Sequence, residues 1–398
     1  MRTEIIEFSG PDYTGKSTQA EMLTFETWHN HVHNFGSFGG YGEGFPQGLN
    51  AQEHFDWWFN TSSLDEMVNA LTSAYLDRDH QAINGQIDVA VYERGQSMIK
   101  AQLAANFATR ASDDVSNYID IISEVVDSKL SGLDSKNKRT EVFLTVDTDW
   151  RERQQKYRSY VRSITTPTGE FSDSQNEFYS AYLYNLEKAL GLLSKDNNLV
   201  VAVDGPALDV NNRLRASQDI FGGQLPALLP QDPLVLGLAG LSESGKSHIA
   251  GLLQVEHGFT RLKMGYFNEA QRHPDVKYAD PSRIALHVLH FIATNRHLSR
   301  VSLESLHGPH INAELKSLLG ERWKSIFIDL NQTTRIERLR QQYPDIDDIL
   351  LLQQQIAKDA IKREAGVESY RDYADVVVDN IGTPAQTVAK IMKELNVL

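Results

Sequence analysis

Short apolar runs alternate along the chain with longer stretches in which apolar residues recur every three or four positions. The short runs are rich in β-branched residues and are typical of buried strands, whereas the periodic stretches are typical of helices. The predicted strands of the first half lie at residues 5–9, 32–35, 87–92, 141–146 and 199–203, and the clearest predicted helices at 16–25 and 64–83. Strands that alternate with helices predict a parallel sheet with helices on both faces.

Residues 222–233 interrupt this pattern with closely spaced glycines and prolines, which predict a linker. The alternation then restarts, with predicted strands at 234–239, 301–306, 325–330 and 376–379, and with helices that begin at 247 and 384. A chain of 398 residues has room for two or three domains of about 100–200 residues each. We therefore predict two α/β domains, residues 1–221 and 234–398, which share a plan but little sequence.

One motif, G-x-x-x-x-G-K-[ST], follows the first predicted strand of each half, at residues 10–17 and 240–247. Between a strand and a helix, its glycines let backbone N–H groups surround a triphosphate, its lysine reaches the outer phosphates, and its hydroxyl binds Mg²⁺. The motif therefore predicts ATP and Mg²⁺ as cofactors. The residues assigned to cofactor binding are Gly10, Asp12, Gly15, Lys16, Ser17, Thr18, Gly240, Gly245, Lys246, Ser247, His248 and Asn380.

Charged residues stand at the carboxyl ends of predicted strands, where ligands bind in open α/β sheets. Glu93 and Arg94 follow one strand, and Glu304 lies near the end of another. A carboxylate there can hold a water of Mg²⁺, and an arginine can grip a phosphate through two hydrogen bonds. Arg151 and Arg153 belong to a segment that could close over the phosphates. We assign metal binding to Ser17, Glu93 and Ser247, and catalytic roles to Lys16, Glu93, Arg94, Arg151, Arg153, Lys246 and Glu304.

Composition narrows the partners and the compartment. The net charge of −14 and the pI of about 5.4 argue against a broad basic surface for nucleic acid, though not against a local basic patch. The chain has no cysteine, which excludes disulfides, thiolate metal sites and cysteine nucleophiles. Its acidic start is unlike a signal peptide, and no apolar run approaches the ~20 residues of a membrane span. We expect a soluble protein of the cytoplasm, or of a host cytoplasm if the source is viral, without a membrane partner.

Over about residues 1–221 the chain resembles the thymidylate kinase family of P-loop kinases. The segments that carry the resemblance are Phe8 to Gln19, Ala74 to His80, Val91 to Arg94, Glu177 with Phe178, and Tyr182. The resemblance implies a nucleoside-monophosphate-kinase fold, transfer of the γ-phosphoryl of ATP to thymidylate, and a dimer, as is common in the family. The residues assigned to substrate binding are Arg78, Arg94, Ala74 and Gln102.

The chain departs from that family around the predicted acceptor site. Residues 36–40 replace its Arg-Glu-Pro-Gly segment, and Glu93 replaces an aspartate. Ala74 stands four residues before Arg78, where relatives often place a base-stacking phenylalanine. A bulkier or modified pyrimidine would fit a site that Ala74 opens.

Over about residues 234–398 the chain resembles the P-loop kinases that include dephospho-CoA kinases and deoxynucleotide monophosphate kinases. The resemblance rests on Gly237 to Gly240, on the arginines between Arg335 and Arg340, and on the closing segment Ala374 to Thr383. It implies a second kinase-like domain in which Asn380 and Gly382 lie near the adenine. The departures are Glu243 inside the loop and His307, where relatives commonly have arginine.

Three functions fit these features, and the sequence leaves them open. The first is a tandem ATP-dependent nucleotide kinase whose acceptor is a thymidylate-like deoxynucleoside monophosphate. The second is a kinase that phosphorylates 5-hydroxymethyluracil in DNA, as in phage thymidine hypermodification. The third pairs one catalytic domain with a regulatory nucleotide-binding domain. The corresponding partners are a nucleotide substrate, modified DNA and a second copy of the chain in a homodimer.

Overall fold

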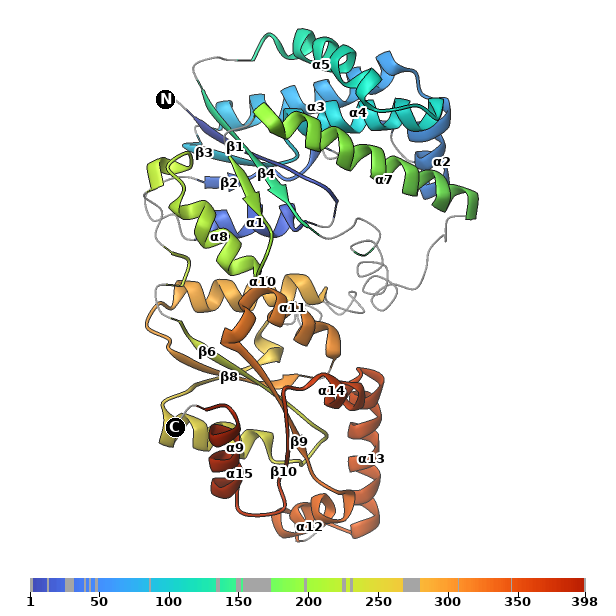
Figure 1. Cartoon of the computed structure of the whole chain (residues 1–398). Coiled ribbons are helices and arrows are strands. Elements are labelled where there is room, and N and C mark those ends of the chain that lie inside the picture. The colour runs from blue at the N-terminus through green and yellow to red at the C-terminus, as the bar shows by residue number, and fades with distance from the viewer. Residues whose placement is uncertain are drawn as a thin grey trace. The chain divides into compact units, whose positions relative to one another are not determined.

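The computed structural model describes residues 3–396 with several gaps. The residues outside the description are 13, 26–31, 39–40, 43, 47–48, 86, 134–136, 148–151, 153–172, 197–198, 224–226, 230–231, 268–279, 307 and 345. The chain divides into two compact units, residues 1–228 and 229–398 (Figure 1).

The first unit is built on a five-stranded sheet in the order β2-β3-β1-β4-β5, and its strands pair in parallel. The strands are β1 (Glu4–Ser9), β2 (Val32–Asn34), β3 (Val89–Glu93), β4 (Lys138–Thr145) and β5 (Val200–Ala202). The α-helices are α1 (Lys16–Thr24), α2 (Ala51–Asp56), α3 (Leu64–Asn84), α4 (Gln96–Ala111), α5 (Ser116–Leu130), α7 (Asp173–Leu193) and α8 (Ala207–Ala216).

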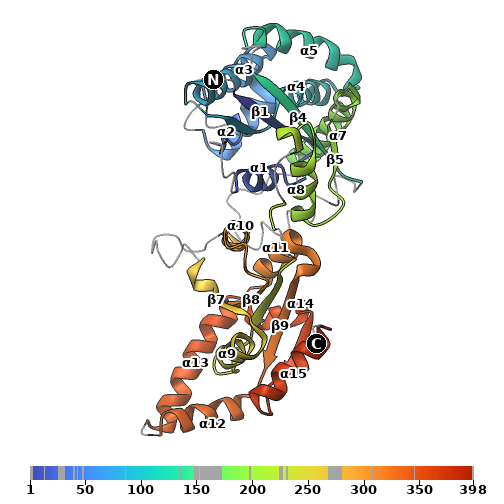
Figure 2. The same ribbon diagram turned by 90° about the vertical axis from the view of Figure 1, so that its left-hand side faces the viewer.

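Both faces of this sheet are covered by helices, because alternate residues of a strand point to opposite sides. Ile5 and Phe143 belong to the core cluster formed with α3, α4, α5 and α7. Ile6, Phe8 and Val142 belong to the cluster formed with α1 and α8 on the opposite face. Figure 1 and Figure 2 show these two helical layers with the sheet between them.

The second unit repeats the plan with a five-stranded parallel sheet in the order β10-β9-β6-β8-β7. The strands are β6 (Leu234–Ala239), β7 (Thr260–Lys263), β8 (Arg300–Leu306), β9 (Trp323–Asp329) and β10 (Val376–Asp379). The α-helices are α9 (Lys246–His257), α10 (Pro281–Thr294), α11 (Pro309–Leu319), α12 (Gln332–Gln342), α13 (Asp348–Glu364), α14 (Val367–Tyr373) and α15 (Pro384–Glu394). α9 and α15 form a core cluster with one face of the sheet, and α11 and α14 contact β9.

Numbered within its own unit, each sheet has the strand order 2-3-1-4-5, with the first strand at the centre. This observation confirms the predicted fold class, a parallel α/β sheet flanked by helices, in both halves. The predicted strands and helices are present, with ends that differ by up to three residues. β7 was not predicted, because its four residues alternate in polarity and sit at a sheet edge.

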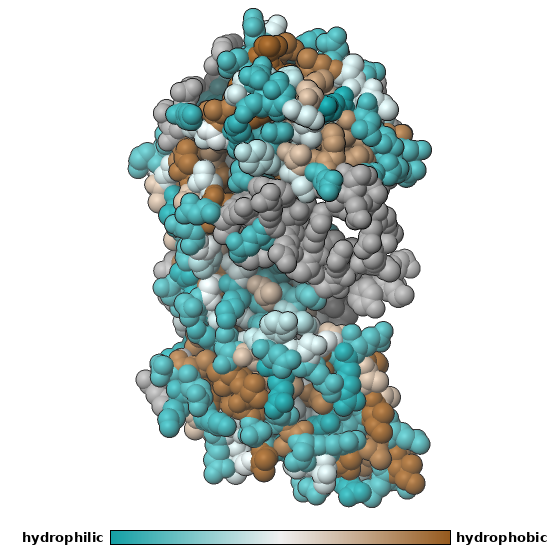
Figure 3. Space-filling view, turned by 45° about the vertical axis from the view of Figure 1, so that its right-hand side comes forward, coloured by the Kyte–Doolittle hydropathy of each residue, from teal (hydrophilic) through white to brown (hydrophobic). Residues whose placement is uncertain are grey.

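Hydrophobic residues reach the surface among hydrophilic ones on the face shown in Figure 3. Among the described residues, no helix is both long enough and apolar enough to cross a membrane.

Candidate functional sites

The loop at residues 10–17 joins the central strand β1 to α1. Gly10 has a φ of +153°, and a Cβ on it would lie 2.6 Å from the carbonyl oxygen of Leu144 on β4. Gly15 caps the start of α1 with a φ of +78°, in the left-handed region. Both positions therefore require glycine for the turn that brings the loop back to the helix N-terminus.

Lys16 lies inside this turn. Its Nζ donates hydrogen bonds to the carbonyl oxygens of Gly10 (3.0 Å) and Pro11 (2.7 Å), and it lies 3.7 Å from Asp12 Oδ1. Burial lowers the pKa of the Lys16 ammonium to about 8; Asp12 partly offsets this effect, and Arg94 adds to it. A desolvated ammonium surrounded by backbone groups favours an anion such as phosphate.

Glu93 lies beside the loop because β3 pairs with β1, and Glu93 is in register with Phe8. Ser17 Oγ donates a 2.6 Å hydrogen bond to Glu93 Oε2. The next residue, Arg94, has a φ of +83°, a conformation that is rare for residues other than glycine. A hydroxyl and a carboxylate at this distance fit Mg²⁺, which takes oxygen ligands and usually keeps several waters. The pair brings together two of the residues that we assigned to metal binding.

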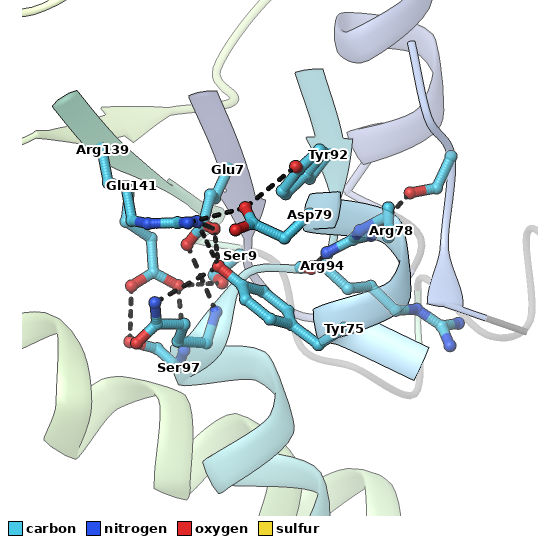
Figure 4. A network of polar contacts seen from close by, with 12 residues as sticks. Glu7, Ser9, Tyr75, Arg78, Asp79, Tyr92, Arg94, Ser97, Arg139 and Glu141 are labelled. Carbon is cyan, nitrogen blue, oxygen red and sulfur yellow. Dashed lines mark hydrogen bonds and ion pairs between the residues drawn. The ribbon is translucent and has the colours of Figure 1, made fainter. Parts of the chain in front are cut away.

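Arg78, assigned to substrate binding, is fully buried in α3. Its guanidinium donates to the carbonyl oxygens of Gly36 (2.8 Å) and Arg94 (2.9 Å), and it lies 4.0 Å from the ring centroid of Tyr92. In Figure 4 the Arg94 side chain points away from these groups. Arg78 therefore holds the backbone at Arg94 in place. Of the two arginines, Arg94 is the one whose side chain can extend toward a ligand.

Ala74 and Gln102, the other residues assigned to substrate binding, lie in α3 and α4. Ala74 is fully buried, and a Cβ on Gly42 would lie 3.0 Å from its Cα, so the glycine-rich segment packs directly against it. The chain itself therefore fills the space beside Ala74. Gln102 is 7% exposed, and its Oε1 accepts no hydrogen bond within the described residues. Gln102 also hydrogen-bonds the buried Tyr182 hydroxyl. Arg151 and Arg153 lie outside the described residues.

The loop at residues 240–247 has the same construction between β6 and α9. A Cβ on Gly240 would lie 2.5 Å from the carbonyl oxygen of Ile328, and one on Gly245 would lie 2.2 Å from Nδ2 of Asn380. Asn380 Nδ2 donates to the carbonyl oxygen of Ser244 (2.8 Å). The Asn380 amide thus braces the loop from β10. His248 and Ser247 are exposed at the start of α9.

Lys246 repeats the contacts of the first loop's lysine. Its Nζ donates to the carbonyl oxygens of Gly240 (2.8 Å) and Leu241 (2.6 Å). Burial lowers its pKa to about 7, and the nearby Lys362 lowers it further. The same site chemistry therefore recurs in the second unit.

The carboxylate of the second site is engaged differently. Glu304 pairs in register with Leu238, two residues before the loop, and accepts a 2.6 Å hydrogen bond from Ser247 Oγ. The following residue, Ser305, has a φ of +67° and is the extra residue of a bulge in β8. Arg261 of the unpredicted strand β7 forms an ion pair with the buried Glu304 carboxylate. The sequence prediction missed Arg261 because it missed β7.

α12 and α13 support the second loop from one side. Arg335 and Asp359 form a buried ion pair (2.5 Å), and Asp359 Oδ1 accepts a 3.0 Å hydrogen bond from the backbone N–H of Ser242. Arg338 donates to the carbonyl oxygen of Asn380 (2.6 Å). Arg335 and Arg338, two of the arginines that carry the resemblance in the sequence, therefore hold the second loop and its neighbouring segment in place. His307 lies outside the described residues.

A buried polar network lies under the N-terminus of α4, beside the first loop (Figure 4). Glu141 accepts hydrogen bonds from Ser9 Oγ (2.5 Å), Ser97 Oγ (2.7 Å) and the backbone N–H of Ser97 (3.1 Å). Arg139 bridges Glu7 (3.3 Å) and Asp79 (2.6 Å). The residues come from β1, β4, α3 and α4, so the sequence offers only isolated charged positions and no pattern that predicts their meeting.

Glu141 makes the stability of the first unit depend on pH. Burial, with the nearby Glu7 charge, raises the pKa of Glu141 from its usual 4.5 to about 7. The folded protein therefore retains a proton that the unfolded chain has released, and unfolding free energy should fall as pH rises from about 4.5 to 7, by on the order of 1–3 kcal/mol. Glu141→Gln should flatten the pH profile of urea unfolding. An unchanged profile in Glu141→Gln, or equal flattening by the exposed Glu124→Gln, would contradict this assignment.

Within the described chain, no group of three or more histidine and carboxylate side chains could hold a metal ion. A Mg²⁺ ion at either loop would therefore combine one hydroxyl, one carboxylate, waters and substrate phosphates, the usual pattern for this ion.

No protein-family model and no curated protein matches the chain. Among solved structures, an uncharacterized protein from Eubacterium ventriosum is similar over 42% of this chain and 99% of its own, with 13% identity and a TM-score of 0.31. A gluconokinase from Sinorhizobium meliloti covers 42% of this chain and 94% of its own (17% identity, TM-score 0.30). The protein TT1252 from Thermus thermophilus covers 42% and 97% (17% identity, TM-score 0.27).

These scores are too low to support an argument, so the class of the protein rests on its own geometry. The chain comprises two α/β units of equal strand order, each with a glycine-bounded loop between its central strand and the next helix. Each loop encloses a buried lysine, and each is flanked by a serine–glutamate pair.

Proposed function

We propose that the chain is an ATP-dependent phosphotransferase, and specifically a tandem nucleotide kinase whose first unit acts on a thymidylate-like deoxynucleoside monophosphate. One observation supports this most. In both units a buried lysine in the loop lies beside a serine–glutamate pair, and each glutamate is in register two residues before the loop's first glycine. Phosphoryl transfer requires this combination of hydrogen-bond donors to the phosphates, oxygen ligands for a metal ion, and fixed geometry.

In the first unit, the loop backbone and Lys16 would hold the phosphates of ATP. Mg²⁺, when bound at Ser17 and Glu93, would neutralise charge on the transferring group. Arg94 would grip the acceptor's phosphate, and Arg78 would keep Arg94 in place through its backbone. Asp12 lies close enough to Lys16 to hold the ammonium until an anion displaces it. Arg151 and Arg153 stay proposed as residues that close over the phosphates.

The test is an acceptor panel assayed by transfer of labelled phosphate from ATP. The panel contains the deoxynucleoside monophosphates and DNA with 5-hydroxymethyluracil, against wild type, Glu93→Gln and Glu304→Gln. We expect thymidylate or a close analogue to accept phosphate, with a loss of about 10²-fold in Glu93→Gln and little change in Glu304→Gln. No transfer to any deoxynucleoside monophosphate would refute the nucleotide kinase, and transfer only to the modified DNA would make the protein a DNA-modification kinase.

The Arg261–Glu304 ion pair favours a second candidate function for the second unit. A guanidinium on Glu304 Oε1 reduces the negative charge that the carboxylate offers to a metal ion at Oε2, beside Ser247, and the first unit has no such ion pair at Glu93 within its described residues. The second unit would then bind nucleotide as a regulatory module. If Glu93→Gln transfers phosphate as fast as wild type while Glu304→Gln has lost the activity, the second unit is catalytic, and this result would contradict the regulatory role.

A further inference from the structure

Glu141 of β4 joins the phosphate loop of the first unit to the start of α4. Its carboxylate accepts a 2.5 Å hydrogen bond from the hydroxyl of Ser9, which directly precedes the loop. The same carboxylate accepts hydrogen bonds from the hydroxyl (2.7 Å) and the backbone N–H (3.1 Å) of Ser97, in the first turn of α4. Figure 4 shows the carboxylate beside both serines. One side chain thus bridges two segments that are distant in the sequence.

The backbone between Arg94 and Ser97 lies directly against this carboxylate. Gly95 is buried, and a Cβ on it would lie 2.6 Å from Glu141 Oε1 and 2.9 Å from Glu7 Oε2. A Cβ at these distances would overlap the carboxylate oxygens, so the close approach requires glycine. The position of this backbone therefore depends on where the Glu141 carboxylate lies.

Arg94 is tied to the same end of β1 through its backbone. Its N–H donates a 2.8 Å hydrogen bond to the carbonyl oxygen of Phe8, and its carbonyl oxygen accepts from the buried Arg78. Phe8 and Ser9 are the last two residues of β1, so the ties to Arg94 and to Glu141 start from neighbouring residues. The Arg94 side chain therefore extends from a backbone that is held before and after it.

The second unit lacks this bridge among its described residues. Gly237, three residues before the first glycine of its loop, is in register with Ser325, as Glu7 is with Glu141 in the first unit. The Ser325 hydroxyl donates a 2.8 Å hydrogen bond to Asp375, which directly precedes β10. The bridge is therefore a feature of the unit to which we assign catalysis, and the shared fold does not require it.

The proposed reaction makes a strict demand on the distance between the two bridged segments. The loop would hold the phosphates of ATP, and Arg94 would grip the phosphate of the acceptor, so their separation sets the alignment of the reacting groups. A misplacement of about 1 Å can lower the rate by about 10²-fold. Hydrogen bonds to a charged group are shorter and stronger than neutral ones, which suits Glu141 to hold this separation.

We propose that Glu141 is a positioning residue, which holds the phosphate loop and Arg94 at the separation that phosphoryl transfer needs. It acts through Ser9 on one side and through Gly95 and Ser97 on the other. This inference rests on the proposed function of the first unit and deepens it, because it gives a residue outside the loop a role in the same reaction.

The test is the transfer of labelled phosphate from ATP to thymidylate by full-length wild type, Glu141→Ala, Glu141→Gln and Thr3→Val. Glu141→Ala removes the bridge, whereas Glu141→Gln keeps an oxygen that can accept from both serines. Thr3→Val is the matched control for stability, because it removes a buried 2.9 Å hydrogen bond to the carbonyl oxygen of Ile87 near the other end of β1. We expect kcat to fall by about 10- to 100-fold in Glu141→Ala, and by less than about threefold in Glu141→Gln and Thr3→Val.

Binding measurements separate a positioning role from a loss of folding. Calorimetric titrations of Glu141→Ala with a non-hydrolysable ATP analogue and with thymidylate should give dissociation constants within about threefold of wild type, because each site keeps its own ligands. If Glu141→Ala does not fold, Ser97→Ala takes its place, since it removes only one hydrogen bond to the carboxylate. Its kcat should fall by about 3- to 10-fold.

Two results would overturn the proposal and leave the kinase standing. One is an equal kcat in Glu141→Ala and Thr3→Val, or in Ser97→Ala and Thr3→Val where Glu141→Ala does not fold. The other is a loss in Glu141→Gln as large as in Glu141→Ala, because the amide keeps the contacts with the serines. A wild type that transfers no phosphate to thymidylate would instead refute the proposed function, and this inference with it.

Discussion

Lys16→Met should lower phosphoryl transfer to the acceptor of the first unit by about 10³-fold or more, without unfolding the protein. The loss follows because the lysine is the cation that the loop encloses, and charge stabilisation at the transferring group is the main contribution to this chemistry. Methionine has a similar length and is apolar. The substitution removes a buried ammonium, and with it the desolvation cost that lowers the Lys16 pKa to about 8, so the melting temperature should be unchanged or higher. Initial rates with labelled ATP and thermal denaturation measure the two effects.

Lys246→Met is the matched control, because Lys246 has the same contacts in the second unit. If the first unit performs the transfer, this substitution should leave the rate within about twofold of wild type. A Lys16→Met protein that retains its rate while Lys246→Met loses it would move the reaction to the second unit. If both variants keep the wild-type rate, neither loop lysine takes part in the reaction.

The second large effect concerns stability. Asp359→Ala should lower the unfolding free energy of the second unit by about 3–5 kcal/mol, because it leaves the Arg335 guanidinium buried without its carboxylate. It also removes the acceptor for the Ser242 N–H, so the loop should lose its fixed geometry. Urea unfolding followed by tryptophan fluorescence reports on this unit when it is measured in a background whose other four tryptophans are replaced by phenylalanine, which leaves Trp323 alone.

A second ion pair between the same two helices is the control. Arg340 and Asp348 are 2.7 Å apart, with side chains that are 51% and 58% exposed. Exposed pairs contribute about 0–1 kcal/mol, so Arg340→Ala should have a small effect. The double variant Arg335→Met with Asp359→Leu should recover much of the lost stability, because it leaves no unpaired charge. Equal losses in Asp359→Ala and Arg340→Ala would refute the argument.

The sequence predicted the parts of this fold that rest on local patterns. Apolar runs placed the central strands, and the glycine spacing placed both loops, because these features depend on neighbours along the chain. The place of Glu93 at the carboxyl edge of the sheet also followed from sequence reasoning, since parallel strands bring their carboxyl ends to one edge. Its register with Phe8 is known only from the structure. The fold class and the grouping of each loop with a carboxylate could therefore be expected.

Contacts between distant segments could not be predicted in this way. From the sequence we assigned Arg78 to substrate binding, and nothing in the sequence indicated that the structure would bury it against Tyr92 and two backbone carbonyls. The partners of Glu304 include Arg261, which lies 43 positions earlier on an edge strand. The Gln355 amide in α13 is buried without a hydrogen-bond partner among the described residues. No sequence pattern indicates this, because it depends on how α12 and α13 pack.

The residues that follow the two carboxylates, Arg94 and Ser305, share a backbone conformation that glycine would adopt at lower cost. Each position spends about 1 kcal/mol or more of conformational energy on keeping a side chain there. Glycine would place the preceding carboxylate equally well, so the cost at Arg94 is associated with its side chain, which we propose grips the acceptor.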